Sequence, residues 1–173
     1  MSNEDRESGR DRSGTDRVRA DTTRRGTTIK VVSRPEASSL KEAARMLGGE
    51  AGEILRPPVV RRHNGTFRFA LMPGDRRISW PKLRAVVGVN KSSLPSVPSA
   101  LEATGYERGT ITPSGSTTAS PVLMNERVLG RRMGLGAGAH GANAWVQADD
   151  LAAGLDAVTA DITMGEGMPD GTR

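Results

Sequence analysis

The chain has no cysteine, only two histidines and five aromatic residues, and each scarcity excludes a kind of chemistry. Without cysteine the protein can form neither disulfides nor thiolate metal sites, and it has no cysteine nucleophile. With His63 and His140 alone, a centre that holds a metal through several histidines is not expected. No apolar run approaches the roughly 18 residues of a membrane span, and the N-terminus lacks the apolar core of a secretory signal. We therefore expect a cytoplasmic protein that contacts no membrane and uses neither a metal nor another cofactor.

Familiar hydrolase and nucleotide-binding motifs are missing as well. The sequence contains no GxSxG nucleophile elbow, no HExxH zinc motif and no GK[ST] of a P-loop. Asp149 and Asp150 are adjacent, so on a helix they would point about 100° apart, which suits an acidic first turn better than an acid/base pair. The chemistry must therefore come from glycines, backbone amides and cations.

The charges of this 173-residue chain are segregated, although the formal net charge is only +5. Residues 56–91 hold nine lysines and arginines against one acid, whereas residues 144–173 hold six acids against one arginine. A basic block inside the folded region is typical of a surface that binds a polyanion, and a solvated basic face is the simpler alternative. The candidate nucleic-acid contacts are Arg61, Arg62, Arg68, Arg76, Arg77 and Lys82.

One folded domain is expected, over residues 27–164, with a charged segment at either end. Residues 1–26 contain three apolar residues and seven arginines, too little apolar surface to offset the entropy of ordering, so we predict a disordered leader. Residues 165–173 are predicted to form a flexible C-terminal tail.

Helices and strands alternate within this domain, and several strands are joined by hairpins. The pattern predicts a mixed α/β (α+β) fold, a single compact domain with a mixed, mostly antiparallel sheet or open barrel flanked by helices. The expected strands and helices include 28–32, 39–47, 59–62, 67–72, 79–87, 96–103 and 148–155. A two-residue turn at Asn64-Gly65 would place Arg61 opposite Arg68.

Two glycine-rich stretches, residues 105–115 and 134–141, are the candidate functional loops. Glycine lets the backbone approach a ligand closely and aim consecutive amides at one point, where they can hold a phosphate or polarise an ester carbonyl. Tight turns between short strands are the simpler alternative. Among the histidines, His140 lies between glycines and is the better candidate, whereas His63 is expected to be exposed beside a turn.

From about Val31 to Ile162 the chain resembles the YbaK/EbsC family of aminoacyl-tRNA editing domains, which also occur inserted in bacterial prolyl-tRNA synthetases. Order and spacing of several motifs carry the resemblance over about 130 residues. These are Leu71-Met72-Pro73-Gly74-Asp75-Arg76-Arg77, Thr104-Gly105-Tyr106, the GxxxP loop from Gly109 to Pro113, and Gly136-Ala137-Gly138-Ala139-His140-Gly141.

The resemblance implies a trans-acting deacylase that hydrolyses the ester of mischarged tRNA, typically a small amino acid on the proline tRNA, by positioning and amide stabilisation without a metal. It implies catalytic roles for Arg56, Gly109 and His140. The substrate-binding residues would be Thr110, Ile111, Thr112, Pro113, Ser114, Gly115, Asn125, Gly136, Gly138 and Gly141. The expected partners are the acceptor end of tRNA and, as a further candidate, a prolyl-tRNA synthetase.

Two departures from the family pattern leave the activity open. Arg56 stands where relatives carry a lysine, and Pro57-Pro58 removes two backbone donors from the strand that follows. Asn125 stands where many relatives have an aspartate, so a negative charge toward the substrate's ammonium group is lost. A catalytically impaired RNA-binding or regulatory relative is therefore the alternative, and a different small-molecule hydrolase on the same fold is a third.

Overall fold

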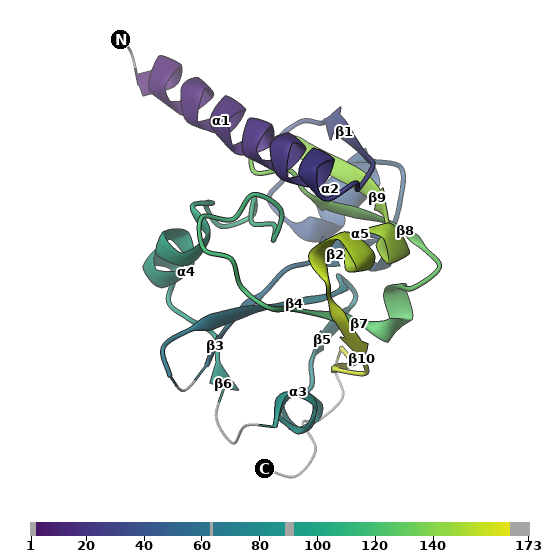
Figure 1. The fold of residues 1–173 in the computed structure, drawn as a ribbon. Helices are drawn as coiled ribbons and strands as arrows, with labels where there is room; N and C mark the ends of the chain where they lie inside the picture. Colours follow the sequence, from purple (N-terminus) through teal and green to yellow (C-terminus); the bar gives the residue numbers. More distant parts are fainter. Residues whose placement is uncertain (1–2, 63, 89–91, 167–173) are drawn as a thin grey trace.

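The computed structural model describes residues 3–62, 64–88 and 92–166 (Figure 1). His63 and most of the predicted tail, residues 167–173, lie outside the described residues. The helices of the protein are α1 (Asn3–Arg24), α2 (Leu40–Met46), α3 (Trp80–Val87), α4 (Val97–Thr104) and α5 (Ala148–Leu155), with short 3-10 turns at Ala51–Glu53 and Glu126–Val128. None of the described helices is long and apolar enough to span a bilayer.

The strands form three sheets, and the mixed α+β fold predicted from the sequence is confirmed. The first sheet has the order β1-β9-β8, from Ile29–Ser33, Ala142–Gln147 and Arg132–Gly136. The second has the order β10-β7-β4-β3-β6, from Val158–Ala160, Val122–Asn125, Phe67–Pro73, Val59–Arg62 and Ser92–Ser93, and β2 (Leu55–Arg56) pairs with the end of β4. The third pairs β5 (Arg76–Ile78) with β11 (Thr163–Gly165). Parallel pairs β4·β7 and β7·β10 sit among antiparallel ones, and the described strands do not close into a barrel.

Strand β4 divides the core into two clusters because its side chains alternate between its two faces. Phe69 and Leu71 belong to the first core cluster, with β7, β8, β9 and α5. Ala70 and Met72 belong to the second core cluster, which packs against α3 and includes Ile162. A strand buried on both faces fixes the relative position of the two halves of the molecule.

The helix boundaries follow from local capping signals, as the sequence predicts. The side chains of Ser39, Ser79 and Ser96 accept hydrogen bonds from backbone amides in the first turns of α2, α3 and α4. Gly88 and Gly105 end α3 and α4 in the left-handed conformation.

The β3–β4 hairpin has a different register from the predicted one. Arg62 and Thr66 close the loop, and Gly65 takes the positive φ, so the loop is one residue longer than an Asn-Gly turn. The shift pairs Arg61 with Phe67 and Val60 with Arg68. The prediction that Arg61 faces Arg68 was wrong, because a one-residue change in register moves each side chain to a new partner.

Residues 3–24, for which the sequence predicts disorder, form helix α1, which lies across the top of the molecule in Figure 1. Its last turns are held by salt bridges from Asp21 to Arg24 and Arg25, and by the side chain of Thr22 donating to the Val18 carbonyl. The side chain of Val18 in this helix is fully buried, whereas Ala20 is exposed. Amino-acid composition does not predict the order of this segment, because the helix is held in place by polar contacts to loops that are distant in the sequence.

Candidate functional site

The two glycine stretches lie side by side, although about 20 residues of chain separate them. We call residues 105–115 the first glycine loop and residues 134–141 the second glycine loop. The amide of Gly138 donates to the carbonyl of Thr110 at 3.2 Å. At Gly136 an added Cβ would lie 2.7 Å from the carbonyl oxygen of Ile111, so the backbones touch where only glycine fits. The loops therefore form one continuous backbone surface.

Buried polar side chains hold the first glycine loop in shape. The hydroxyl of Tyr106 donates to the Ser114 carbonyl at 2.8 Å, and the Thr110 hydroxyl donates to the Glu107 carbonyl at 2.8 Å. Burial raises the pKa of Tyr106 to about 12, against the opposing influence of the nearby Arg17 cation. Thr112 and Ser114 are fully buried, so of the predicted substrate-binding hydroxyls these two face the protein interior.

The open side of the two loops carries an ionisable pair. Nε2 of His140 lies 3.1 Å from a carboxylate oxygen of Glu107, and both side chains are exposed. Gly109 is exposed on the same loop, with no atom within 4 Å of the position its Cβ would take. The structure thus brings His140 and Gly109, two of the three predicted catalytic residues, onto the joined loops. Glu107 was not among the predicted site residues.

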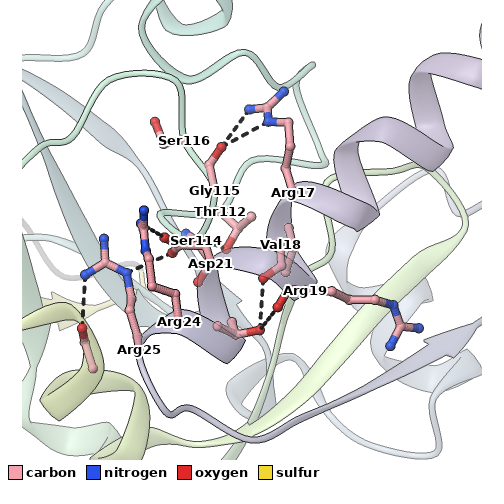
Figure 2. Close-up of polar contacts among 12 residues, drawn as sticks. Arg17, Val18, Arg19, Asp21, Arg24, Arg25, Thr112, Ser114, Gly115 and Ser116 are labelled. Carbon is pink, nitrogen blue, oxygen red and sulfur yellow. Dashed lines mark hydrogen bonds and ion pairs between the residues drawn. The ribbon is translucent and has the colours of Figure 1, made fainter.

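Helix α1 contacts both loops, and Figure 2 shows its Arg17 side chain beside Gly115. The Arg17 guanidinium donates to the carbonyls of Gly115, Thr104 and Gly105 at 2.8–3.4 Å and lies 4.4 Å from the centre of the Tyr106 ring. The hydroxyl of Thr15 donates to the carbonyl of Ala137 on the second loop at 3.1 Å. Gly26 is the local sequence signal that marks the end of this helix. It has a positive φ, and the amides of Gly26 and Thr27 donate to carbonyls of the last turn.

Arg56, the third predicted catalytic residue, lies on β2 and not on either glycine loop, although the neighbouring Ile54 pairs with Gly134 of the second glycine loop. It is in register with Met72, whose side chain is in the second core cluster, whereas Ile111 packs against the first. Side chains of residues that pair across two strands project from the same face of the sheet. The Arg56 side chain therefore projects from the face that carries Met72, opposite the face of the first core cluster. Its guanidinium is 3.8 Å from the carboxylate of Glu166, and both side chains are solvent-accessible, so this pair contributes little stability.

Asn125 is fully buried and its amide is engaged within the protein. Its nitrogen donates to the Thr163 hydroxyl, and its oxygen accepts from the amide of Arg127 at the start of a 3-10 turn. Thr163 also accepts from the Arg76 side chain at 2.7 Å. The geometry gives Asn125 the role of tying β7 to β11.

The basic block meets the acidic C-terminal segment in space. Lys82 pairs with Asp161 at 2.8 Å, and Arg56 approaches Glu166. Burial together with the neighbouring Arg62 cation lowers the pKa of Arg68. In the part of the chain that the structure describes, the Nε atoms of Arg62, Arg68 and Arg77 are buried without a hydrogen-bond partner. Arg62 and Arg68 lie close enough to repel one another, and Arg61 on the same strand as Arg62 is exposed, so positive charge gathers where β3 pairs with β4.

The described residues do not provide a set of side chains that could bind a metal ion. Across the described ranges, no three histidine, aspartate or glutamate side chains gather closely enough to hold an ion. The groups available for chemistry are the loop amides, the His140–Glu107 pair and the guanidinium groups.

Comparison with solved structures shows the same fold in other proteins. A candidate trans-editing enzyme for prolyl-tRNA synthetase is 29% identical, with a TM-score of 0.79 over 88% of this chain and 98% of that one. A scaffold protein from a study of epitope grafting by computational design is 27% identical, with a TM-score of 0.79 over 88% of this chain and 97% of its own. A hypothetical protein at 23% identity has a TM-score of 0.80 over 86% of this chain and 99% of its own, which shows the shared fold. The comparison with curated proteins found no match.

The family comparison covers both glycine loops and most of the sheet framework. The aminoacyl-tRNA editing domain family matches residues 34–153, which leaves α1, β1, β10 and β11 outside the matched range. The match extends over more than half of the chain and includes every predicted substrate-binding residue. The chain belongs to the YbaK-like family of aminoacyl-tRNA editing domains.

Proposed function

We propose that this protein is a trans-acting deacylase that hydrolyses the ester of mischarged tRNA, with small amino acids on the proline tRNA as its substrates. The contact between the two glycine loops carries the proposal. It supports a surface of backbone amides beside an exposed histidine, and family membership supports aminoacyl-tRNA as the substrate class. An aminoacyl ester is already labile, so orientation and stabilisation of the developing oxyanion supply most of the rate.

In this mechanism the ester carbonyl lies against the amides around Gly109 of the first glycine loop. As water attacks the carbonyl carbon, negative charge moves to the carbonyl oxygen, and the amides stabilise it. Glu107 accepts the Nε2 proton of His140, which leaves Nδ1 free to take a proton from the attacking water. The ester C–O bond then breaks, the ribose oxygen of the terminal adenosine takes the proton back from Nδ1 of His140, and the amino acid is released.

The basic surface would bind the RNA backbone. Arg62 and Arg68 repel one another and lack partners for their Nε atoms, and a phosphate between them would relieve both costs. Arg61, on the same strand as Arg62, would extend this surface, and Arg56 would anchor the acceptor end. Arg76, Arg77 and Lys82 follow the other end of β4 and would make separate contacts. Affinity for tRNA should therefore fall steeply as salt concentration rises.

A second candidate, an RNA-binding relative without turnover, is favoured by one observation. Arg56 replaces the lysine of the family pattern, and its guanidinium lies near the Glu166 carboxylate. Its side chain projects from the face of the sheet that carries Met72, whereas Ile111 packs on the other face. In that case the protein would bind tRNA and leave its ester intact.

The test is deacylation of proline tRNA charged with alanine, cysteine or serine. The variants are Arg56→Ala, Arg56→Lys and His140→Ala, with Arg45→Ala, an exposed arginine on α2, as the matched control. We expect the wild type and Arg45→Ala to exceed spontaneous hydrolysis, and His140→Ala to lose about 100-fold or more, the usual contribution of a general base. No turnover by the wild type, with activity appearing in Arg56→Lys, would establish the second candidate instead.

A further inference from the structure

Helix α1 is an addition to the editing domain that nevertheless contacts the candidate site. The family match begins at residue 34, whereas α1 ends at Arg24. The helix contacts the backbone of both glycine loops, through Arg17 to the first and Thr15 to the second. A segment outside the family core thus lies against the part of the core that the reaction requires.

The contacts of Arg17 are suited to fixing the ends of the first glycine loop. Its guanidinium joins Thr104 and Gly105 at the start of the loop to Gly115 at its end, so one side chain closes the loop across its base. The planar group donates through several N–H bonds in fixed directions, which the single ammonium of a lysine does not reproduce. Stacking on Tyr106, whose hydroxyl bonds the Ser114 carbonyl, adds a second link to the same loop.

The backbone of α1 approaches the second loop so closely that both partners are glycines. An added Cβ at Gly138 would lie 2.7 Å from the Gly14 carbonyl oxygen and 2.8 Å from the Tyr106 ring. Gly138 also has a φ of +77° and donates its amide to Thr110. The helix, the aromatic ring and both loops therefore meet at one place, where the position of each depends on the others.

We propose that α1 acts as a built-in clamp on the glycine loops and that Arg17 is a positioning residue for the deacylation reaction. Arg17 holds the first glycine loop in the conformation that aims its amides at the ester carbonyl, and the helix touches neither the ester nor the tRNA. This inference rests on the proposed deacylase function, because it assigns Arg17 an effect on that reaction.

The experiment compares Arg17→Ala and Arg17→Lys with Arg19→Ala in the full chain. Arg19 lies on the same helix, is exposed, and points away from Gly115 in Figure 2, so its replacement matches the loss of charge without the loss of loop contacts. Two assays are run: amide hydrogen exchange within residues 105–115, and deacylation kinetics that give kcat and KM for proline tRNA charged with alanine. Exchange in β4 and β7 reports whether the core itself has loosened.

In Arg17→Ala we expect loop amides to exchange about tenfold faster or more, the factor lost with one hydrogen bond to a charged donor, while β4 and β7 stay protected. We expect kcat to fall about 10- to 100-fold with little change in KM, because the loop is misplaced but the RNA surface is intact. Arg17→Lys should resemble Arg17→Ala, and Arg19→Ala should resemble the wild type.

Three results would overturn the clamp: loop exchange that matches the Arg19→Ala control, full restoration of kcat by lysine, or a uniform rise of exchange through the core. A wild type without deacylase activity would instead refute the proposed function, and the exchange measurement would still report whether Arg17 orders the loop.

Discussion

Replacing Gly136 by alanine tests the contact between the two glycine loops directly. Gly136 has no positive φ, so alanine suits its backbone conformation and the effect depends on space alone. The new Cβ would lie 2.7 Å from the Ile111 carbonyl oxygen and 3.1 Å from that of Thr110. Both obstacles are backbone atoms, which cannot swing aside as a side chain can.

The magnitude follows from the distance that the loops must move. Bringing the Cβ to ordinary contact, roughly 3.4 Å, separates the loops by about 0.7 Å and strains the Gly138–Thr110 hydrogen bond. Overpacking of this kind costs about 1–3 kcal/mol, which lowers the melting temperature of a domain of this size by roughly 2–12 °C. A displacement near 1 Å within a catalytic arrangement reduces turnover by up to about 100-fold.

The assay combines thermal unfolding with deacylation kinetics, and Gly49→Ala is the matched control. Gly49 also has an ordinary φ, but its added Cβ would meet the flexible Glu53 carboxylate at 3.0 Å, which can move away. We expect Gly49→Ala to keep its stability and activity within small margins. If Gly136→Ala were as stable and as active as this control, the loops could not be in contact as described.

Two further predictions concern buried polar groups. Tyr106 is the only tyrosine in the chain, so tyrosinate absorbance should report its pKa alone, near 12 in the folded protein and near 10 in urea. Because the folded-state pKa is the higher one, the neutral Tyr106 side chain stabilises the folded protein fully below about pH 10, and this stabilisation is lost as the pH rises toward 12. A folded protein whose tyrosine ionises near pH 10 would contradict the burial of this ring. Asn125→Ala should lower the free energy of unfolding in urea by about 1–3 kcal/mol, because the buried Thr163 hydroxyl and the backbone amide of Arg127 lose their partner. A residue that mainly contacts substrate would change specificity and leave stability intact.

The elements with local signals could be predicted from the sequence. Serine caps and terminal glycines mark α2, α3 and α4, and the apolar alternation of residues 67–72 marks the central strand. The family resemblance assigned substrate-binding residues to both glycine stretches. The hydrogen bond from Gly138 to Thr110 joins the two stretches, and their role in binding substrate stays a prediction.

The features that the sequence did not reveal depend on contacts between distant residues. Helix α1 is held by Arg17 donating to carbonyls that lie 87–98 residues away, and no composition or periodicity signals such a contact. The pairing of β5 with β11 likewise brings the acidic C-terminal segment to the basic block, which the sequence shows only as two separate runs of charge. The register of the β3–β4 hairpin differed from the predicted one because the loop closes at Arg62 and Thr66. The Asn-Gly sequence does not determine whether the loop contains two residues or three.

The short link between α1 and the first sheet determines how the helix can move. Only residues 25–28 separate Arg24 from Ile29, and β1 is hydrogen-bonded along its whole length to β9. Four residues span roughly 15 Å at most, so a released helix stays beside the loops at an effective concentration in the millimolar range. Dilution therefore leaves the helix in place, and a free peptide with the sequence of α1 would compete with it only at millimolar concentrations.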